Sequence, residues 1–226
     1  TLDRSSAASD VYKRQDPESF QITADALWIG EEFGPYLIKA DLKGRVLGVF
    51  ETLVDGKRVR SPDHPSVVTP GAPGGKVAFE ARRSKGYEGM AASPDGSKLY
   101  ALLEGPLWKE TEQAYEQVDG KEALRVLEFD TRQAAWTGRS WFYPLEANGH
   151  AIGDFNLVDM QSAADGSHAV GLVIERDNGE GTADRACPAG TKAANCFDDI
   201  ARFKRVYKIA FGLSLIHISE PTRQAE

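Results

Sequence analysis

Residues 87–104 read YEGMAASPDGSKLYALLE, and this stretch contains the pattern that determines the predicted fold. An acid, Glu88, precedes a short run of small and apolar residues, and a second apolar run ends at another acid, Glu104. Pro94-Asp95-Gly96 separates the two runs and is a turn signal, because Gly accepts the backbone angles that tight turns require. The stretch therefore predicts two hairpin-connected β-strands flanked by carboxylates.

The same order of acid, strand, turn, strand and acid occurs in two further, looser copies. The earlier copy has Glu18 before its first strand, and the later copy has Asp154. The copies start about 65–70 residues apart, insertions included. Several hairpin-connected strands in each repeat are typical of a β-propeller blade. We therefore predict an all-β protein, an incomplete β-propeller of about three blades of antiparallel sheet. A β-sandwich is the alternative, but it does not explain the recurring acids.

The segment 109–118 is the one stretch that we interpret as a candidate helix. It is polar and carries no Gly or Pro, so its sequence is compatible with a helix. An ordered or mobile insertion between strands is the alternative.

Both ends of the chain are interpreted as not native. Asp10–Gln15 can be encoded by a DNA segment whose opposite strand encodes Leu213–Ile218. Such a segment looks like the mosaic end of a transposon-based sequencing library, which would make the chain a metagenomic fragment between translated adapters. We therefore expect residues 1–15 and 213–226 to be adapter-derived tails that make few contacts, and residues 16–212 to be the native β-propeller fragment.

Charge and hydropathy limit the class of partner. The chain has 27 Lys and Arg against 34 Asp and Glu, a formal net charge of −7 at pH 7. A negative chain is repelled by a phosphate backbone, which argues against non-specific binding of nucleic acid. Because no apolar run approaches the roughly 20 residues that a membrane helix needs, we expect no membrane span.

Two cysteines, Cys187 and Cys196, enclose a short polar loop. A disulfide that closes a loop of this size would stabilise the fold by about 2–3 kcal/mol through the entropy of the unfolded chain. Two free thiols are the alternative, and a metal site is a weaker one, since zinc usually takes four ligands. A disulfide would indicate an oxidising compartment.

The acids recur at corresponding places in the copies, and successive blades of a propeller bring corresponding positions together around one axis. We expect Glu32, Glu88, Asp154 and Glu175 on one face near that axis, where clustering would raise the pKa of each carboxyl group. Oxygen ligands in this number suit Ca²⁺. The alternative is that these acids cap turns or carry solvated charge. The candidate metal ligands are Glu18, Glu31, Glu32, Glu88, Glu104, Asp154, Glu175 and Asp177.

Basic residues lie near the acids in the sequence, and a mixed site suits a metal-bridged phosphate ester, because Arg binds phosphate through two donors. The candidate catalytic residues are Glu88, Glu175 and Arg176. Arg82, Arg83 and Lys85, just before Glu88, read equally well as solubilising charge. The chain has no Gly-x-Ser-x-Gly elbow. We expect His64 and His168 in exposed loops, while His150 is a weaker candidate for a site.

Four stretches together resemble the phytase-like family, which is labelled as having the esterase-like activity of phytase. They are residues 16–20 (DPESF), 28–36 (WIGEEFGPY), 87–96 (YEGMAASPDG) and 175–178 (ERDN). The resemblance implies a periplasmic or secreted bacterial β-propeller that hydrolyses phosphate or other esters and depends on Ca²⁺. The insertion between Cys187 and Cys196 also looks like a feature of this family.

Three functions follow as hypotheses. The first is a metal-assisted hydrolase of a small, phosphorylated or otherwise esterified molecule, in which the cation replaces a side-chain nucleophile. The second is a lactonase-type propeller enzyme with Glu88, directly before Gly89, as a metal ligand. The third is a non-catalytic propeller that binds a ligand or partner and holds a structural Ca²⁺.

Overall fold

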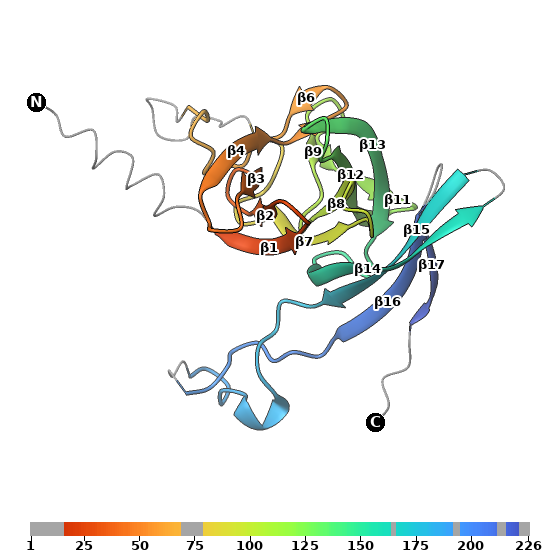
Figure 1. Cartoon of the computed structure of the whole chain (residues 1–226). Helices are drawn as coiled ribbons and strands as arrows, with labels where there is room; N and C mark the ends of the chain where they lie inside the picture. The colour runs from red at the N-terminus through yellow and green to blue at the C-terminus, as the bar shows by residue number, and fades with distance from the viewer. Residues whose placement is uncertain (1–15, 69–78, 164–165, 192–194, 212–215, 222–226) are drawn as a thin grey trace, which may run out of the picture.

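The computed structural model describes residues 16–68, 79–163, 166–191, 195–211 and 216–221. This part of the chain is all-β, apart from one 3₁₀ turn, Ala183–Arg185, and its main elements are three antiparallel sheets of four strands (Figure 1). The all-β prediction is therefore confirmed. No helix in the described residues is long and apolar enough to cross a membrane.

Each sheet contains strands that follow one another closely along the chain. The first sheet has the order β1 (Pro17–Ile22), β2 (Leu27–Glu31), β3 (Tyr36–Ala40) and β4 (Val46–Glu51). The second comprises β7 (Tyr87–Ala92), β8 (Lys98–Leu103), β12 (Lys121–Asp130) and β13 (Ala135–Pro144). The third comprises β14 (Ala151–Ala163), β15 (Gly166–Arg176), β16 (Lys204–Phe211) and β17 (Ile216–Pro221). Each predicted repeat therefore corresponds to one four-stranded sheet.

The segment predicted as a helix forms strands instead. It contributes to the pair β9 (Trp108–Lys109) and β10 (Ala114–Tyr115) and contains β11 (Gln117–Val118), which pairs with β12. The rings of Trp108 and Tyr115 meet edge to face across this hairpin, with their centroids 5.1 Å apart. Cross-strand aromatic packing and tertiary contacts override the weak helix propensity of the polar residues. A further small hairpin, β5 (Leu53–Val54) and β6 (Lys57–Arg58), follows the first sheet.

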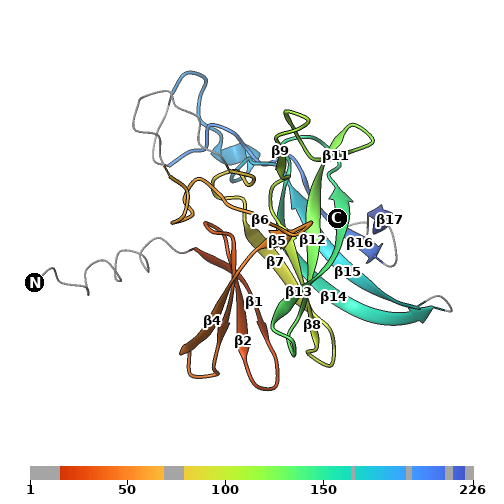
Figure 2. The same cartoon turned by 90° about the horizontal axis from the view of Figure 1, so that it is seen from above.

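The three sheets lie side by side in chain order, with the second sheet between the other two (Figure 2). Their first strands are neighbours, because β7 packs against both β1 and β14. One apolar core lies between the first and second sheets and contains Trp28, Leu37 and Phe129. The other lies between the second and third sheets and contains Tyr143 and Phe155. The structure thus brings the starts of the three repeats together.

Glycine permits the closest of these approaches. A Cβ atom on Gly89 of β7 would lie 2.7 Å from the backbone nitrogen of Phe155 in β14. A Cβ atom on Gly86 would lie 2.2 Å from the carbonyl oxygen of Glu32. Real Cβ atoms do not come this close to backbone, so both positions need glycine.

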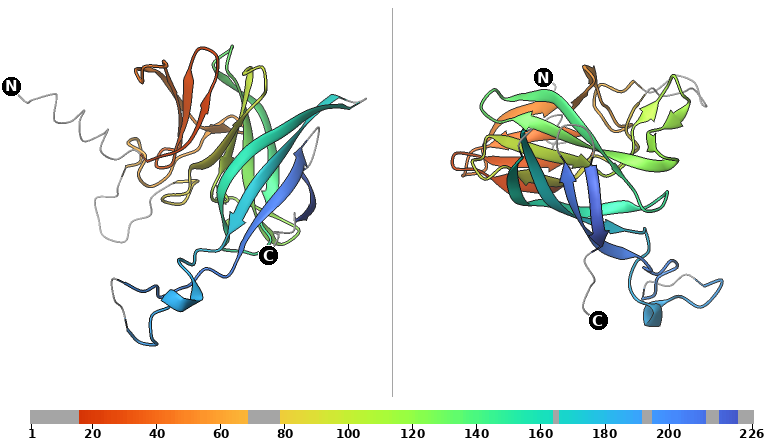
Figure 3. Two further views of the ribbon diagram at one scale, coloured as in Figure 1. Left: turned by 60° about the horizontal axis from the view of Figure 1, so that its bottom comes forward. Right: turned by 90° about the vertical axis from the view of Figure 1, so that its right-hand side faces the viewer.

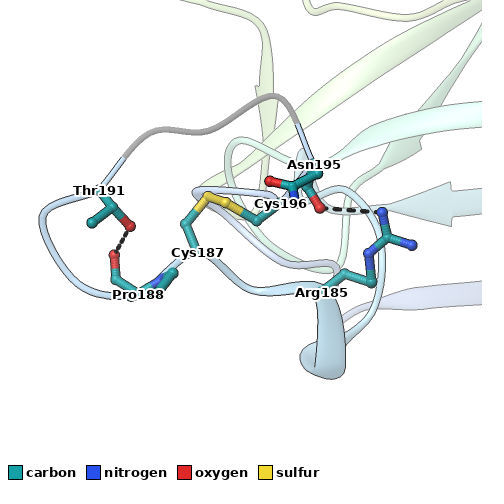
Figure 4. Close-up of a disulfide and its surroundings, with 6 residues drawn as sticks. All are labelled: Arg185, Cys187, Pro188, Thr191, Asn195 and Cys196. Atoms are coloured by element: carbon teal, nitrogen blue, oxygen red, sulfur yellow. Dashed lines mark hydrogen bonds between the residues drawn. A yellow bond between two sulfur atoms is a disulfide. The ribbon is translucent and has the colours of Figure 1, made fainter.

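The segment between β15 and β16 extends away from the sheets and carries the disulfide (Figure 3). Cys187 and Cys196 are bonded, with their Cα atoms 4.9 Å apart, so the disulfide prediction is confirmed over free thiols and a metal site. Arg185 donates a hydrogen bond of 3.1 Å to the carbonyl oxygen of Asn195 and supports the same loop (Figure 4).

The C-terminal segment that we interpret as adapter-derived includes β17. This strand pairs with β16 at the edge of the third sheet, so the expectation of few contacts is wrong for residues 216–221. The strand occupies an edge and not the centre of the sheet. Residues 1–15 lie outside the described part of the chain, and the limits of the native fragment stay a prediction.

Candidate metal and anion site

Each of the three neighbouring first strands contains a β-bulge at the same place. In β1 the register skips Glu18, in β7 it skips Glu88, and in β14 it skips Gly153. A bulge leaves one residue unpaired and turns its side chain away from the regular alternation of the strand. The structural counterpart of Glu18 and Glu88 is therefore Gly153 and not Asp154, which is a correction of the repeat alignment made from the sequence.

The ends of the second strands correspond in the same way. Glu31, Leu103 and Glu175 each pair with the residue before a bulge. The residues that follow them, Glu32, Glu104 and Arg176, are therefore equivalent. The first two repeats contribute acids at both positions of this rim. The third contributes a glycine and a cation.

Carboxylates from the first two sheets converge at the rim. One oxygen from each of Glu32, Glu88 and Glu104 lies within 4.8 Å of the others. A second group with the same spacing consists of Asp16, Glu18 and Glu32, so Glu32 belongs to both groups. Glu32 and Glu104 are buried, whereas Glu88 is half-buried. Several hard oxygen donors at this spacing could hold Ca²⁺, which commonly takes six to eight of them.

Two cations border the carboxylates. Lys85 Nζ lies 2.9 Å from Glu104 Oε1, and Arg176 Nη2 lies 3.3 Å from the same oxygen. Arg176 Nη2 is also 4.0 Å from Glu88 Oε1. Arg176 is therefore placed as predicted, next to Glu88. Sequence reasoning noted Lys85 only as surface charge, and it missed Asp16, whose signal was its place two residues before Glu18.

Burial raises the pKa of Glu32 and that of Glu88 to about 7. The negative charge of Glu104 adds to the burial effect in both cases. The pKa of Glu18 is raised too, first by burial and then by its hydrogen bond to Asp16. The cluster therefore carries more negative charge than its two cations offset, and an added cation would relieve this repulsion.

An open cleft of about 480 Å³ lies along the first strands beside the cluster. Glu18 and Glu88 line it together with Gly153 and Asp154. Asp154 accepts hydrogen bonds from its neighbours Phe155 N at 2.7 Å and Asn156 Nδ2 at 3.1 Å. Asp154 thus faces the same cleft as the acids, although it lies one residue beyond their structural counterpart.

Glu175 belongs to a different environment. It is fully buried, and its carboxylate accepts hydrogen bonds from Tyr143 Oη at 2.7 Å and Glu146 N at 2.8 Å. His150 Nδ1 lies 2.7 Å from the same carboxylate. Successive residues of a strand point to opposite faces, so Glu175 faces the second sheet while Arg176 faces the cluster. The expected grouping of Glu175 with Glu32 and Glu88 is not what the structure shows.

Two other predicted ligands hold local backbone. Glu31 accepts hydrogen bonds from Phe33 N at 3.0 Å and Gly34 N at 2.8 Å, and thereby closes the turn after β2. Asp177 accepts from Arg202 N at 2.8 Å and Phe203 N at 2.9 Å, which ties down the base of the disulfide loop. These contacts match the capping alternative for both acids.

The histidines differ from the expectation. His64 is buried instead of exposed, its Nε2 atom lies 2.9 Å from Tyr36 Oη, and its Nδ1 accepts from Ser66 N at 3.0 Å. His168 is in strand β15 instead of a turn. The ring of His150 packs against Phe203, with centroids 4.3 Å apart, and lies beside Glu175.

The fold and the rim together define a class of protein, an all-β protein of repeated four-stranded sheets with an acidic site where the repeats meet. A family model described as phytase-like, with the esterase-like activity of phytase, matches residues 2–216. The chain therefore belongs to the phytase-like family, a family of phytase- or esterase-like hydrolases. No curated protein gives a significant match to the chain.

Proposed function

We propose that the protein is a metal-assisted hydrolase of phosphate or other esters, in which Glu32, Glu88 and Glu104 hold a Ca²⁺ ion. The observation that carries the proposal is the convergence of these three carboxylates beside Lys85 and Arg176. Acids alone would suggest a structural ion, whereas adjacent guanidinium and ammonium groups also provide for an anionic substrate.

The side chains divide the work. The carboxylates would bind and orient the ion, and Asp16 and Glu18 would add oxygens from the neighbouring group. A bound cation supplies charge that polarises an ester and activates water at neutral pH. Arg176 would hold a phosphate oxygen at the edge of the cluster, because its guanidinium is only half-buried and already faces it. The open cleft along β1, β7 and β14 offers room for a small molecule.

The β-propeller architecture is part of this proposal. Three sheets in chain order with neighbouring first strands are what blades around one axis require. The disulfide supports an extracellular or periplasmic location, since such bonds persist in oxidising compartments.

The first test is Ca²⁺ binding measured by thermal unfolding. Excess Ca²⁺ should stabilise the protein by about 2.7 kcal/mol at a hundredfold excess over Kd. Glu88→Gln should remove most of this stabilisation. Glu112→Gln, at an exposed acid of the β9–β10 hairpin, is the matched control and should keep it. Equal stabilisation of both variants would contradict the assignment of Glu88.

The second test is turnover of p-nitrophenyl phosphate, phytate and a panel of lactones with and without Ca²⁺. Metal-dependent release of phosphate that is weakened by Glu88→Gln and by Arg176→Gln supports the proposal, and Arg132→Gln is the control at an exposed Arg. Turnover of lactones alone would favour a lactonase-type enzyme. Stabilisation by Ca²⁺ without any turnover would favour a non-catalytic propeller.

A further inference from the structure

We infer that the chain associates head to tail with a second copy, so that the outer face of the first sheet packs on the outer face of the third. Here the outer face of the first sheet means the side opposite the Trp28–Leu37 core, and that of the third sheet means the side opposite Phe155. This inference concerns an interaction surface and does not depend on the proposed hydrolytic function.

The outer face of the first sheet is apolar across all four strands. Strand pairing aligns one row of side chains, Phe20, Ile29, Ile38 and Val49, and a second row, Ile22, Leu27, Ala40 and Val46. The outermost members of these rows are largely exposed: Phe20 65%, Ile22 65%, Val49 52% and Val46 47%. A contiguous apolar surface on a sheet is typical of an interaction site, because exposed apolar area is costly in water.

The bulges show what this face is built to contact. Two residues after each bulge come Phe20, Met90 and Phe155, which are therefore equivalent. Met90 is buried in the core between the second sheet and the first, and Phe155 is buried in the core between the third sheet and the second. The second and third sheets thus use this face to pack on the sheet that precedes them. In the first sheet the same face is exposed.

The complementary face is also present in the chain. In the first two sheets the opposite side, with Trp28 and Tyr100 at equivalent positions, packs on the sheet that follows. Register places Leu172 at the same position in the third sheet. Leu172 and Ile174 are only half-buried, whereas Val173 between them is buried against the second sheet. One chain therefore carries both halves of a contact that it already makes twice internally.

The two outer faces cannot meet within one molecule, because the second sheet lies between the first and third sheets (Figure 2). In a solution of this chain, the partner that presents the matching sheet face is another copy. The contact joins two different surfaces and is heterologous, so it leads to a closed ring or to a chain of molecules.

The test is sedimentation velocity of the whole chain over protein concentrations of about 1–100 µM, the range in which weak sheet contacts associate. The wild type should sediment faster as its concentration rises. Val49→Lys and Leu172→Lys should each lower association at least about tenfold, since each places a charge in the contact. Leu53→Lys, at an exposed apolar residue near β13, is the control and should associate like the wild type. Circular dichroism should show the same strand content for all variants.

Mixing the two variants gives the decisive result. Val49→Lys keeps an intact face on the third sheet, and Leu172→Lys keeps an intact face on the first. An equimolar mixture should therefore form a complex that stops at two molecules. A wild type that stays monomeric throughout, or a mixture that does not associate, would overturn the inference. So would a Leu172→Lys variant that associates normally, because the contact would then be between two first sheets.

Discussion

Glu175 and Arg176 are neighbours in the sequence and act in separate parts of the structure. Glu175 is bonded to Tyr143 and Glu146, whereas Arg176 reaches Glu104 and Glu88. The alternation of side chains along β15 separates them. Two adjacent charged residues in a strand therefore do not make one site, and only Arg176 remains beside the acidic cluster.

The titration of Glu32 and Glu88 predicts how stability depends on pH. Their pKa values are raised from 4.5 to about 7 in the folded protein, so between these values the folded state binds more protons than the unfolded state. The free energy of unfolding should therefore fall as the pH rises from about 4.5 to about 7, and then level off. After allowance for solvent screening, a fall of about 1–2 kcal/mol would lower Tm by roughly 3–6 °C.

Thermal unfolding in Ca²⁺-free buffers across this pH range measures the effect. Glu88→Gln should flatten the curve because it removes one of the two titrating groups, while Glu112→Gln should leave its slope unchanged. Stability that rises from pH 4.5 to 7 in the wild type would show that the carboxylates are not crowded in the folded protein.

A second prediction concerns Gly89, where β7 meets β14. Gly89→Ala would place a methyl group 2.7 Å from Phe155, so one of the strands must shift, at a cost of about 1–3 kcal/mol. Gly153→Ala is the matched control, because a Cβ atom there has its nearest neighbour at 3.7 Å. Urea unfolding should show a clear loss for Gly89→Ala and little change for Gly153→Ala. Equal losses would point to backbone entropy instead of packing.

Among the elements, the strands β9, β10 and β11 depend on a buried ion pair. Arg125 of β12 donates to Glu116 through Nε and Nη2, at distances of 2.7 to 3.2 Å, and its guanidinium lies 4.0 Å from the ring centroid of Phe142. Both side chains of the pair are buried. The pair anchors the segment that joins β8 to β12.

We predict that Arg125→Met destabilises the protein by about 3–5 kcal/mol, because it leaves the carboxylate of Glu116 buried without its cation. Combining it with Glu116→Leu should recover most of the loss, since the double variant buries no charge. Urea unfolding of the wild type and both variants provides the comparison. If the double variant is as unstable as the single one, the packing of Arg125 against Phe142 matters more than the charge.

At the scale of the whole molecule, the sheets differ in how their edges are protected. The edge strand of the third sheet is β17, within the segment interpreted as adapter-derived. Strand β16, in contrast, contributes Tyr207 and Ile209 to the core. An added edge strand covers hydrogen-bonding groups but need not support the core.

A chain that ends at Gly212 should therefore keep its strand content by circular dichroism and lose at most about 1 kcal/mol, roughly 2–4 °C in Tm. A chain that ends at Phe203 removes β16 as well, and it should lose the third sheet. A large loss on removing residues 213–226 alone would show that β17 is integral to the fold.

The sequence by itself determined the all-β class, the three repeats, the hairpin turns and the disulfide, because each depends on local pattern or short spacing. It also identified Glu32, Glu88, Glu104 and Arg176 as residues of interest. The short segment 109–118 was misread, since its strands depend on Arg125 and on aromatic pairing that local propensity does not express.

Only the tertiary structure decided which acids share a site. A single bulge residue shifts the register by one position, so Gly153 and Arg176, and not Asp154 and Glu175, correspond to the acids of the other repeats. The partners of Glu175 come from β13 and from the turn after it, about 30 residues away in the chain. Register and long-range contacts follow from the packing of whole sheets, and for that reason no local sequence pattern specifies them.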